Sequence, residues 1–100
     1  MLLALSLTGL VSFYSSSLQG LPTASGTRFD NYKLTAAHKT LPFGTQVLIE
    51  NPKNKRCVVV VITDRGPYHK ARVLDLSQAA FKHLSPLSTG VLQVRYRVLK

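Results

Sequence analysis

The chain has 100 residues, 45% of them hydrophobic, which leaves room for one domain with a packed core and excludes a disordered chain. Thirteen basic against four acidic residues give a net charge of +9, which favours nucleic acid, anionic lipid or acidic cell-wall polymers as partners. The basic residues are scattered and the few aromatic residues are not interleaved with them, so nucleic-acid binding is not expected.

The first eleven residues are rich in leucine and resemble the apolar part of a secretory signal. The segment has no basic start and no cleavage site, and it is far shorter than the roughly 20 residues of a membrane span. Two interpretations of residues 1–8 stay open: a remnant of an export signal, or a lead-in to a domain that spans residues 9–100. Residues 11–15 predict a strand, and the Ser/Gly/Pro/Thr-rich stretch from Ser15 to Gly26 predicts a long surface loop.

Two further strands are expected at residues 44–50 and 56–63, joined as a hairpin by the polar turn 51–55. The second of these strands is apolar at consecutive positions, which predicts burial on both faces. Cys57 lies at its start and is expected to be a small buried residue, because one cysteine completes neither a disulfide nor a metal or redox pair.

The last third of the chain predicts a strand at residues 72–76, a helix at 78–84 capped by Ser77, and a strand at 92–98. The final strand alternates, with Leu92, Val94, Tyr96 and Val98 on one face and polar residues on the other. Several short strands with one short helix favour a closed or nearly closed β-barrel over a sandwich.

The chain has four carboxylates, at Asp30, Glu50, Asp64 and Asp75. Asp64 directly follows the apolar strand and precedes Arg65-Gly66-Pro67, so it is expected at the rim of the barrel. Partial burial there would suit a general acid. The alternative is an ordinary turn in which Asp64 accepts hydrogen bonds from backbone amides.

His38 has no second histidine or cysteine at ligand spacing, so we expect no metal and no cofactor. Its imidazole either orients a carboxylate, binds a sugar hydroxyl, or has a structural role. His69 and His83 are expected at the surface.

Five sequence blocks resemble rare lipoprotein A-like proteins and occur in the same order as in that family. They are Thr23-Ala24-Ser25-Gly26, Phe29-Asp30, the segment from Leu34 to Gly44, Asp64-Arg65-Gly66-Pro67, and the segment from Arg72 to Ser77. The resemblance covers essentially the whole chain. It implies a mainly β fold, a six-stranded double-psi β-barrel with one or two short helices, similar to the barrel domain of expansins. It also implies export to the bacterial cell envelope, in the periplasm or associated with the outer membrane.

By this resemblance the protein is an endolytic lytic transglycosylase that cleaves peptidoglycan glycan strands, preferably peptide-stripped, with formation of a 1,6-anhydro product. Asp64 would be the acid and base and His38 its neighbour. Candidate sugar-binding residues are Tyr14, Thr23, Ser25, Thr27, Arg65 and Asp75.

Thr27 departs from the family, which often has glutamate at this position. The alternative function is therefore a non-catalytic, expansin-like module that binds cell-wall polysaccharide. A monomer without a stable membrane span is expected in either case.

Overall fold

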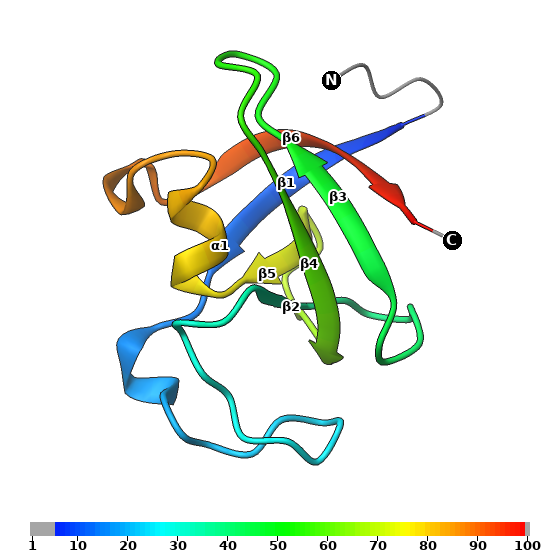
Figure 1. Cartoon of the computed structure of the whole chain (residues 1–100), viewed down its shortest axis with the longest axis vertical. Coiled ribbons are helices and arrows are strands. Elements are labelled where there is room, and N and C mark those ends of the chain that lie inside the picture. The colour runs from blue at the N-terminus through cyan, green and yellow to red at the C-terminus, as the bar shows by residue number, and fades with distance from the viewer. Residues whose placement is uncertain (1–5, 100) are drawn as a thin grey trace.

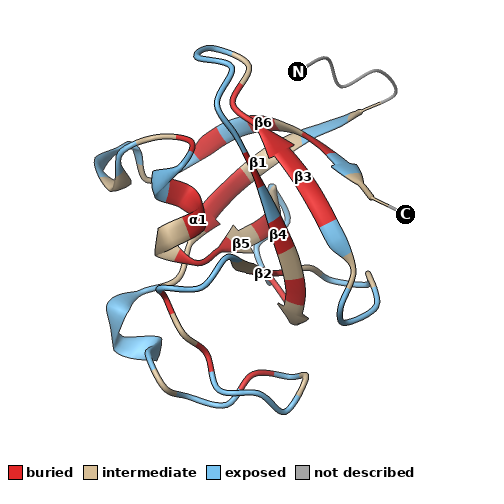
Figure 2. Ribbon diagram, in the orientation of Figure 1, coloured by how far each residue is buried: buried red, intermediate tan, exposed pale blue. Residues whose placement is uncertain are grey.

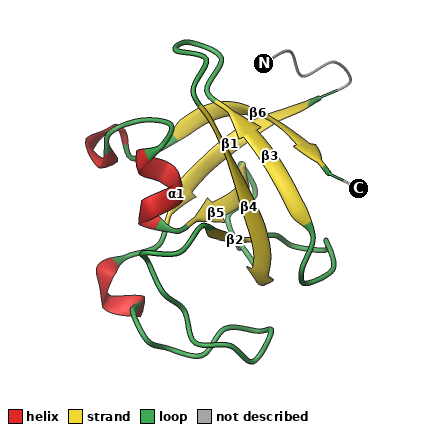
Figure 3. Ribbon diagram, viewed as in Figure 1, coloured by secondary structure: helices red, strands yellow, loops and turns green. Residues whose placement is uncertain are grey.

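The computed structural model describes residues 6–99, which form a closed six-stranded barrel in the order β1-β5-β2-β4-β3-β6 (Figure 1). The strands are β1 (Leu7–Phe13), β2 (Thr35–Ala37), β3 (Gln46–Glu50), β4 (Cys57–Asp64), β5 (Arg72–Leu76) and β6 (Leu92–Val98). Three short helices accompany them: η1 (Ser16–Leu18), α1 (Gln78–Lys82) and η2 (Leu87–Thr89) (Figure 3). The mainly β, closed double-psi barrel predicted from the sequence is confirmed.

Two of the six strand pairs are parallel, and both contain an irregularity. β1 runs parallel to β5 and β2 runs parallel to β4, while the other four pairs are antiparallel. The register between β1 and β5 skips Val73, and the register between β2 and β4 skips Thr63. Such bulges increase the local twist and redirect the side chains that follow.

The core fills the barrel, and every strand contributes buried residues to it (Figure 2). In β4, Val58, Val60 and Ile62 are buried, whereas the intervening Val59 is 38% exposed. The prediction that this strand is buried on both faces is therefore wrong. A barrel wall has an inside and an outside, and no helix covers the outer face at Val59, so consecutive valines do not imply two buried faces.

Cys57 is exposed, which also contradicts the sequence prediction. It starts β4 on the same face as Val59, and its partner across the ladder is Glu50 of β3. The hairpin of β3 and β4 is confirmed. The alternation of β6 is confirmed as well, because Leu92, Val94 and Tyr96 are buried while Gln93 and Arg97 are exposed.

Helix α1 begins where the sequence predicts, with Ser77 as its N-cap. The Ser77 hydroxyl accepts a hydrogen bond from Ala80 N at 3.2 Å. The helix buries Phe81, whose ring makes an edge contact with Phe13 of β1 at a centroid distance of 4.9 Å. The helix lies beside the barrel and contacts β1, β4 and β5 (Figure 3).

Three segments differ from what the sequence predicts. Strand β1 begins at Leu7 rather than residue 11, because residues 7–11 pair with β6. No sequence pattern predicts strand β2, because its three residues have small side chains and carry no periodic signal. The segment from Ser15 to Gly26 is largely exposed, yet Thr23 is buried, and the amides of Ala24 and Ser25 donate hydrogen bonds to Asp64 and Thr63 of β4. Most of the possible export-signal remnant at residues 1–8 lies outside the described residues.

Candidate functional site

Four neighbouring strands align the two candidate carboxylates in one row across the barrel. Asp64 at the end of β4 is the register partner of Ala37 in β2, Ala37 is the partner of Asp75 in β5, and Asp75 is the partner of Ser12 in β1. Two inter-strand spacings, about 10 Å, therefore separate the backbones at the two aspartates. The bulge at Thr63 brings Asp64 into this row.

Asp64 is held by three hydrogen bonds. Its Oδ1 accepts from the backbone amides of Ala24 at 2.8 Å and of Arg65 at 2.9 Å. Its Oδ2 accepts from the Tyr14 hydroxyl at 2.6 Å. Both interpretations of Asp64 from the sequence describe part of this geometry, because the carboxylate caps backbone amides and also faces an open groove.

Tyr14 follows β1 and is fixed by aromatic packing. Its ring stacks on Phe29 with a centroid distance of 4.1 Å and an interplanar angle of 17°. Burial, the hydrogen bond to Asp64, and the negative charges of Asp64 and Asp75 raise the pKa of Tyr14 well above its usual range. The phenol therefore stays protonated and remains a donor to the carboxylate.

Thr23, Ser25 and Thr27 form a cluster of three mutually hydrogen-bonded hydroxyl groups. The oxygen distances are 2.9 Å between Thr23 and Ser25, 3.0 Å between Ser25 and Thr27, and 3.1 Å between Thr23 and Thr27. The turn that carries them also presents the Ala24 amide to Asp64. The three hydroxyl groups therefore lie in the same loop segment as the amide that binds the Asp64 carboxylate.

His38 contacts Asp64 through its backbone. The His38 amide donates to the Asp64 carbonyl oxygen at 3.1 Å. Its imidazole Nδ1 accepts from the amides of Thr40 at 3.1 Å and Leu41 at 3.0 Å. Burial, with Arg65 and Lys39 nearby, lowers the pKa of His38. Among the described residues, no hydrogen bond joins the imidazole to the Asp64 carboxylate, so its role as a catalytic neighbour stays a prediction.

Arg65 fastens the loop that follows β2. Its guanidinium donates to the carbonyl oxygens of Leu41 at 2.8 Å and His38 at 3.2 Å. The same group lies over the Phe43 ring, 4.1 Å from its centroid. The side chain of Arg65 thus stabilises the loop next to Asp64, and its backbone amide binds the Asp64 carboxylate.

An open groove of about 380 Å³ runs over this row of strands. It is lined by Tyr14, Asp64, Arg65 and Asp75 of the predicted site residues, whereas Thr23, Ser25, Thr27 and His38 lie outside its lining. Lining residues that sequence analysis did not single out as site residues include Ser12, Tyr68, His69 and Arg72. His69 and His83 are exposed, as predicted.

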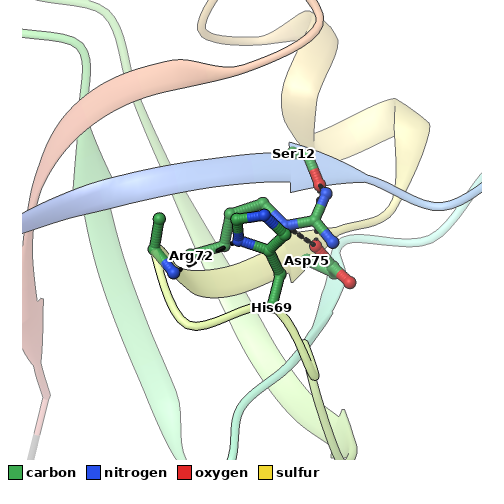
Figure 4. Close-up of polar contacts among 5 residues, drawn as sticks. Ser12, His69, Arg72 and Asp75 are labelled. Carbon is green, nitrogen blue, oxygen red and sulfur yellow. Dashed lines mark hydrogen bonds and ion pairs between the residues drawn. The ribbon is translucent and has the colours of Figure 1, made fainter.

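Asp75 belongs to a polar network at the other end of the groove (Figure 4). Its Oδ1 accepts from the Ser12 hydroxyl at 2.7 Å and lies 3.8 Å from Arg72 Nε. Arg72 Nη1 in turn donates to the Ser12 oxygen at 2.9 Å. The register of β1 and β5 sets this network, which no local sequence pattern could reveal.

Residues 6–99 contain no group of three histidine, cysteine or acidic side chains placed to hold a metal ion. In the same part of the chain, no helix has the length and apolarity needed to cross a membrane.

Comparison with known proteins identifies the family. A sequence profile described as lytic transglycolase matches residues 6–96. The chain belongs to the lytic transglycolase family. The resemblance to rare lipoprotein A-like proteins is confirmed by relatives of that name. A probable endolytic peptidoglycan transglycosylase RlpA from Nostoc is 48% identical over 95% of this chain and 26% of its own length. The relative of the same name from Aquifex aeolicus is 46% identical over 92% of this chain and 41% of its own.

This member of the lytic transglycolase family spans between a quarter and two-fifths of these relatives' length. Among solved structures, a Streptomyces papain inhibitor matches with a TM-score of 0.78 and 27% identity, over 97% of this chain and 96% of that one. A Clavibacter michiganensis expansin solved with cellohexaose matches with a TM-score of 0.76 and 18% identity, over 95% of this chain and 50% of that one. The expansin likeness supports the fold alone.

Proposed function

We propose that this protein is an endolytic peptidoglycan transglycosylase of the bacterial cell envelope and that Asp64 is its acid and base. The observation that carries the proposal is Asp64 itself, a carboxylate that lines the groove and whose orientation is fixed by two backbone amides and one phenol. Relatives that are 46–48% identical over nearly the whole chain are named for this activity.

One carboxylate is sufficient for this reaction. The proton on Asp64 passes to the glycosidic oxygen as the bond from that oxygen to C1 of N-acetylmuramic acid breaks. The C6 hydroxyl of the same sugar then bonds to C1 and returns its proton to Asp64, which closes the 1,6-anhydro ring. No water molecule is consumed, so a second carboxylate to activate one is not required.

The hydrogen bonds of Asp64 suggest which oxygen carries the proton. Oδ1 already accepts two amides, so we assign the transferred proton to Oδ2. The Tyr14 hydroxyl on Oδ2 can accept from the protonated acid and donate to the ionised one, because a hydroxyl does both. Tyr14 thus holds Asp64 in place in both states of the cycle.

The test is mass spectrometry of soluble products after incubation with intact and with amidase-stripped peptidoglycan. We expect 1,6-anhydro-muramic ends from the wild type, with more product from the stripped strands, and none from Asp64→Asn. Asp64→Asn should still sediment with the wall, since the asparagine retains the shape of the side chain. Activity of the wild type would also show that Thr27 is compatible with catalysis.

Products with ordinary reducing ends would contradict the transglycosylase mechanism and indicate hydrolysis. A wild type that binds the wall but releases no product would instead support an expansin-like binding module.

A further inference from the structure

We propose that the Asp75 end of the groove is a separate sugar-binding subsite, in which Arg72, Asp75 and Tyr68 hold the pyranose ring next to the one cleaved at Asp64. The inference rests on the proposed function in so far as the ligand is a glycan strand. The family resemblance already makes Asp75 a candidate sugar-binding residue, and the new elements are the partners Arg72 and Tyr68 and the ring that the three residues would hold.

The placement of Asp75 argues for a neighbouring ring. Asp64 and Asp75 line the same groove, and the backbones that carry them are about 10 Å apart, with the small side chain of Ala37 between them. When the sugar that is cleaved lies at Asp64, the next sugar of the glycan chain therefore lies over Ala37 and Asp75. Because the side chain of Ala37 is small, it leaves room in the groove between the two aspartates.

The contacts of Asp75 fix the orientation of its carboxylate. Its Oδ1 accepts the Ser12 hydroxyl, and the Arg72 guanidinium lies 3.8 Å away. A carboxylate held in one orientation is suited to accept a hydrogen bond from a sugar hydroxyl.

Unused hydrogen-bonding groups remain for a ligand. Among the described residues, the only side-chain contacts of Asp75 are at Oδ1, which leaves Oδ2 as an acceptor. Arg72 uses Nη1 for Ser12, and its Nε is buried and therefore closed to a ligand. Its Nη2 makes no hydrogen bond among the described residues and carries two N–H groups, so Asp75 and Arg72 together offer one acceptor and two donors, the pattern that two neighbouring hydroxyl groups of a pyranose require.

Tyr68 supplies an apolar face. It lies on the loop between β4 and β5, lines the same groove, and is 89% exposed. An aromatic ring left in water next to unused polar groups is characteristic of a surface that binds an amphipathic ligand. The C–H face of a sugar ring is such a ligand.

The experiment measures binding in the inactive Asp64→Asn background, so that turnover does not interfere. The probe is soluble glycan strands of alternating N-acetylglucosamine and N-acetylmuramic acid without stem peptides, titrated by calorimetry. We expect Asp75→Asn and Tyr68→Ala each to raise the Kd by about tenfold or more. Tyr32→Ala is the matched control, because Tyr32 is 86% exposed and lies outside the groove, and its Kd should equal that of the parent.

A second measurement separates binding from chemistry. In the otherwise wild-type protein, Asp75→Asn should raise KM while kcat stays within a fewfold, with anhydro ends still formed. A collapse of kcat at unchanged KM, an unchanged Kd for both groove variants, or no binding by the parent would overturn the subsite. If the subsite variants weaken binding but the wild type forms no anhydro product, the proposed reaction fails while the subsite stands. Thermal melting of each variant checks that the barrel is intact.

Discussion

The contact between Tyr14 and Asp64 is the most specific interaction of the site. The phenol donates to Oδ2 at 2.6 Å, and its ring is held independently by the stack on Phe29. Tyr14→Phe removes the donor and keeps the stack, so the fold should persist. A hydrogen bond to a charged group contributes about 1.5–3 kcal/mol, so we expect kcat to fall by about 10- to 150-fold. Tyr32→Phe, which alters an exposed tyrosine outside the groove, should leave kcat unchanged. Equal kcat values for the two variants would contradict the positioning role.

His38 makes the stability of the fold depend on pH. Its Nδ1 accepts two backbone amides, which only the neutral imidazole can do, and burial with Arg65 and Lys39 lowers its pKa below 6.5. The unfolded chain therefore binds a proton more readily than the folded one, and this contribution to stability is lost as the pH falls through 6.5 towards the folded pKa. We expect urea midpoints to show a smaller loss between pH 7.5 and pH 5.5 for His38→Asn than for the wild type. An identical loss in both proteins would exclude His38 as the source.

At the scale of the elements, the bulge between β1 and β5 depends on a close approach. A Cβ on Gly9 would lie 2.7 Å from Val73 Cγ2 and 2.8 Å from Cγ1, and Val73 is the residue that the β1–β5 register skips. Gly9→Ala should therefore destabilise the protein by about 1–3 kcal/mol, the usual cost of overpacking. In a Val73→Ala background the same change should cost much less. Additive losses of unfolding free energy across this double-mutant cycle would contradict the steric explanation.

The sequence predicts an element well where a local pattern marks it. It predicts burial poorly where burial depends on how the barrel closes. The Ser77 cap and the alternation of β6 are local patterns, and both are confirmed. Cys57 and Val59 are exposed because they lie on the outer face of the barrel wall, where no other element of the described residues covers β4. A run of apolar residues does not indicate which face of a strand is covered. Likewise, Asp64 was singled out as a rim acid from its position, whereas its bond to Tyr14 joins residues 50 positions apart.

At the scale of the whole molecule, the net charge of +9 should act separately from the groove. The groove contacts proposed above involve sugar hydroxyls, whereas a basic surface attracts any acidic polymer, over a screening length of about 10 Å in 0.1 M salt and about 3 Å in 1 M salt. We therefore expect Asp64→Asn to sediment with the wall less as salt rises, while its Kd for oligomers of N-acetylglucosamine, which carry no charge, changes little.

A single-residue comparison on β6 sharpens this prediction. Arg97 and Gln93 are both exposed on the outer face of the strand. In the Asp64→Asn background, Arg97→Gln should weaken wall binding at low salt and reduce its salt dependence, because one cation is lost. Gln93→Ser changes the same surface without changing the charge and should match the parent. Salt-independent sedimentation, or equal effects of the two substitutions, would mean that the groove alone holds the protein on the wall and that the basic surface has no part in it.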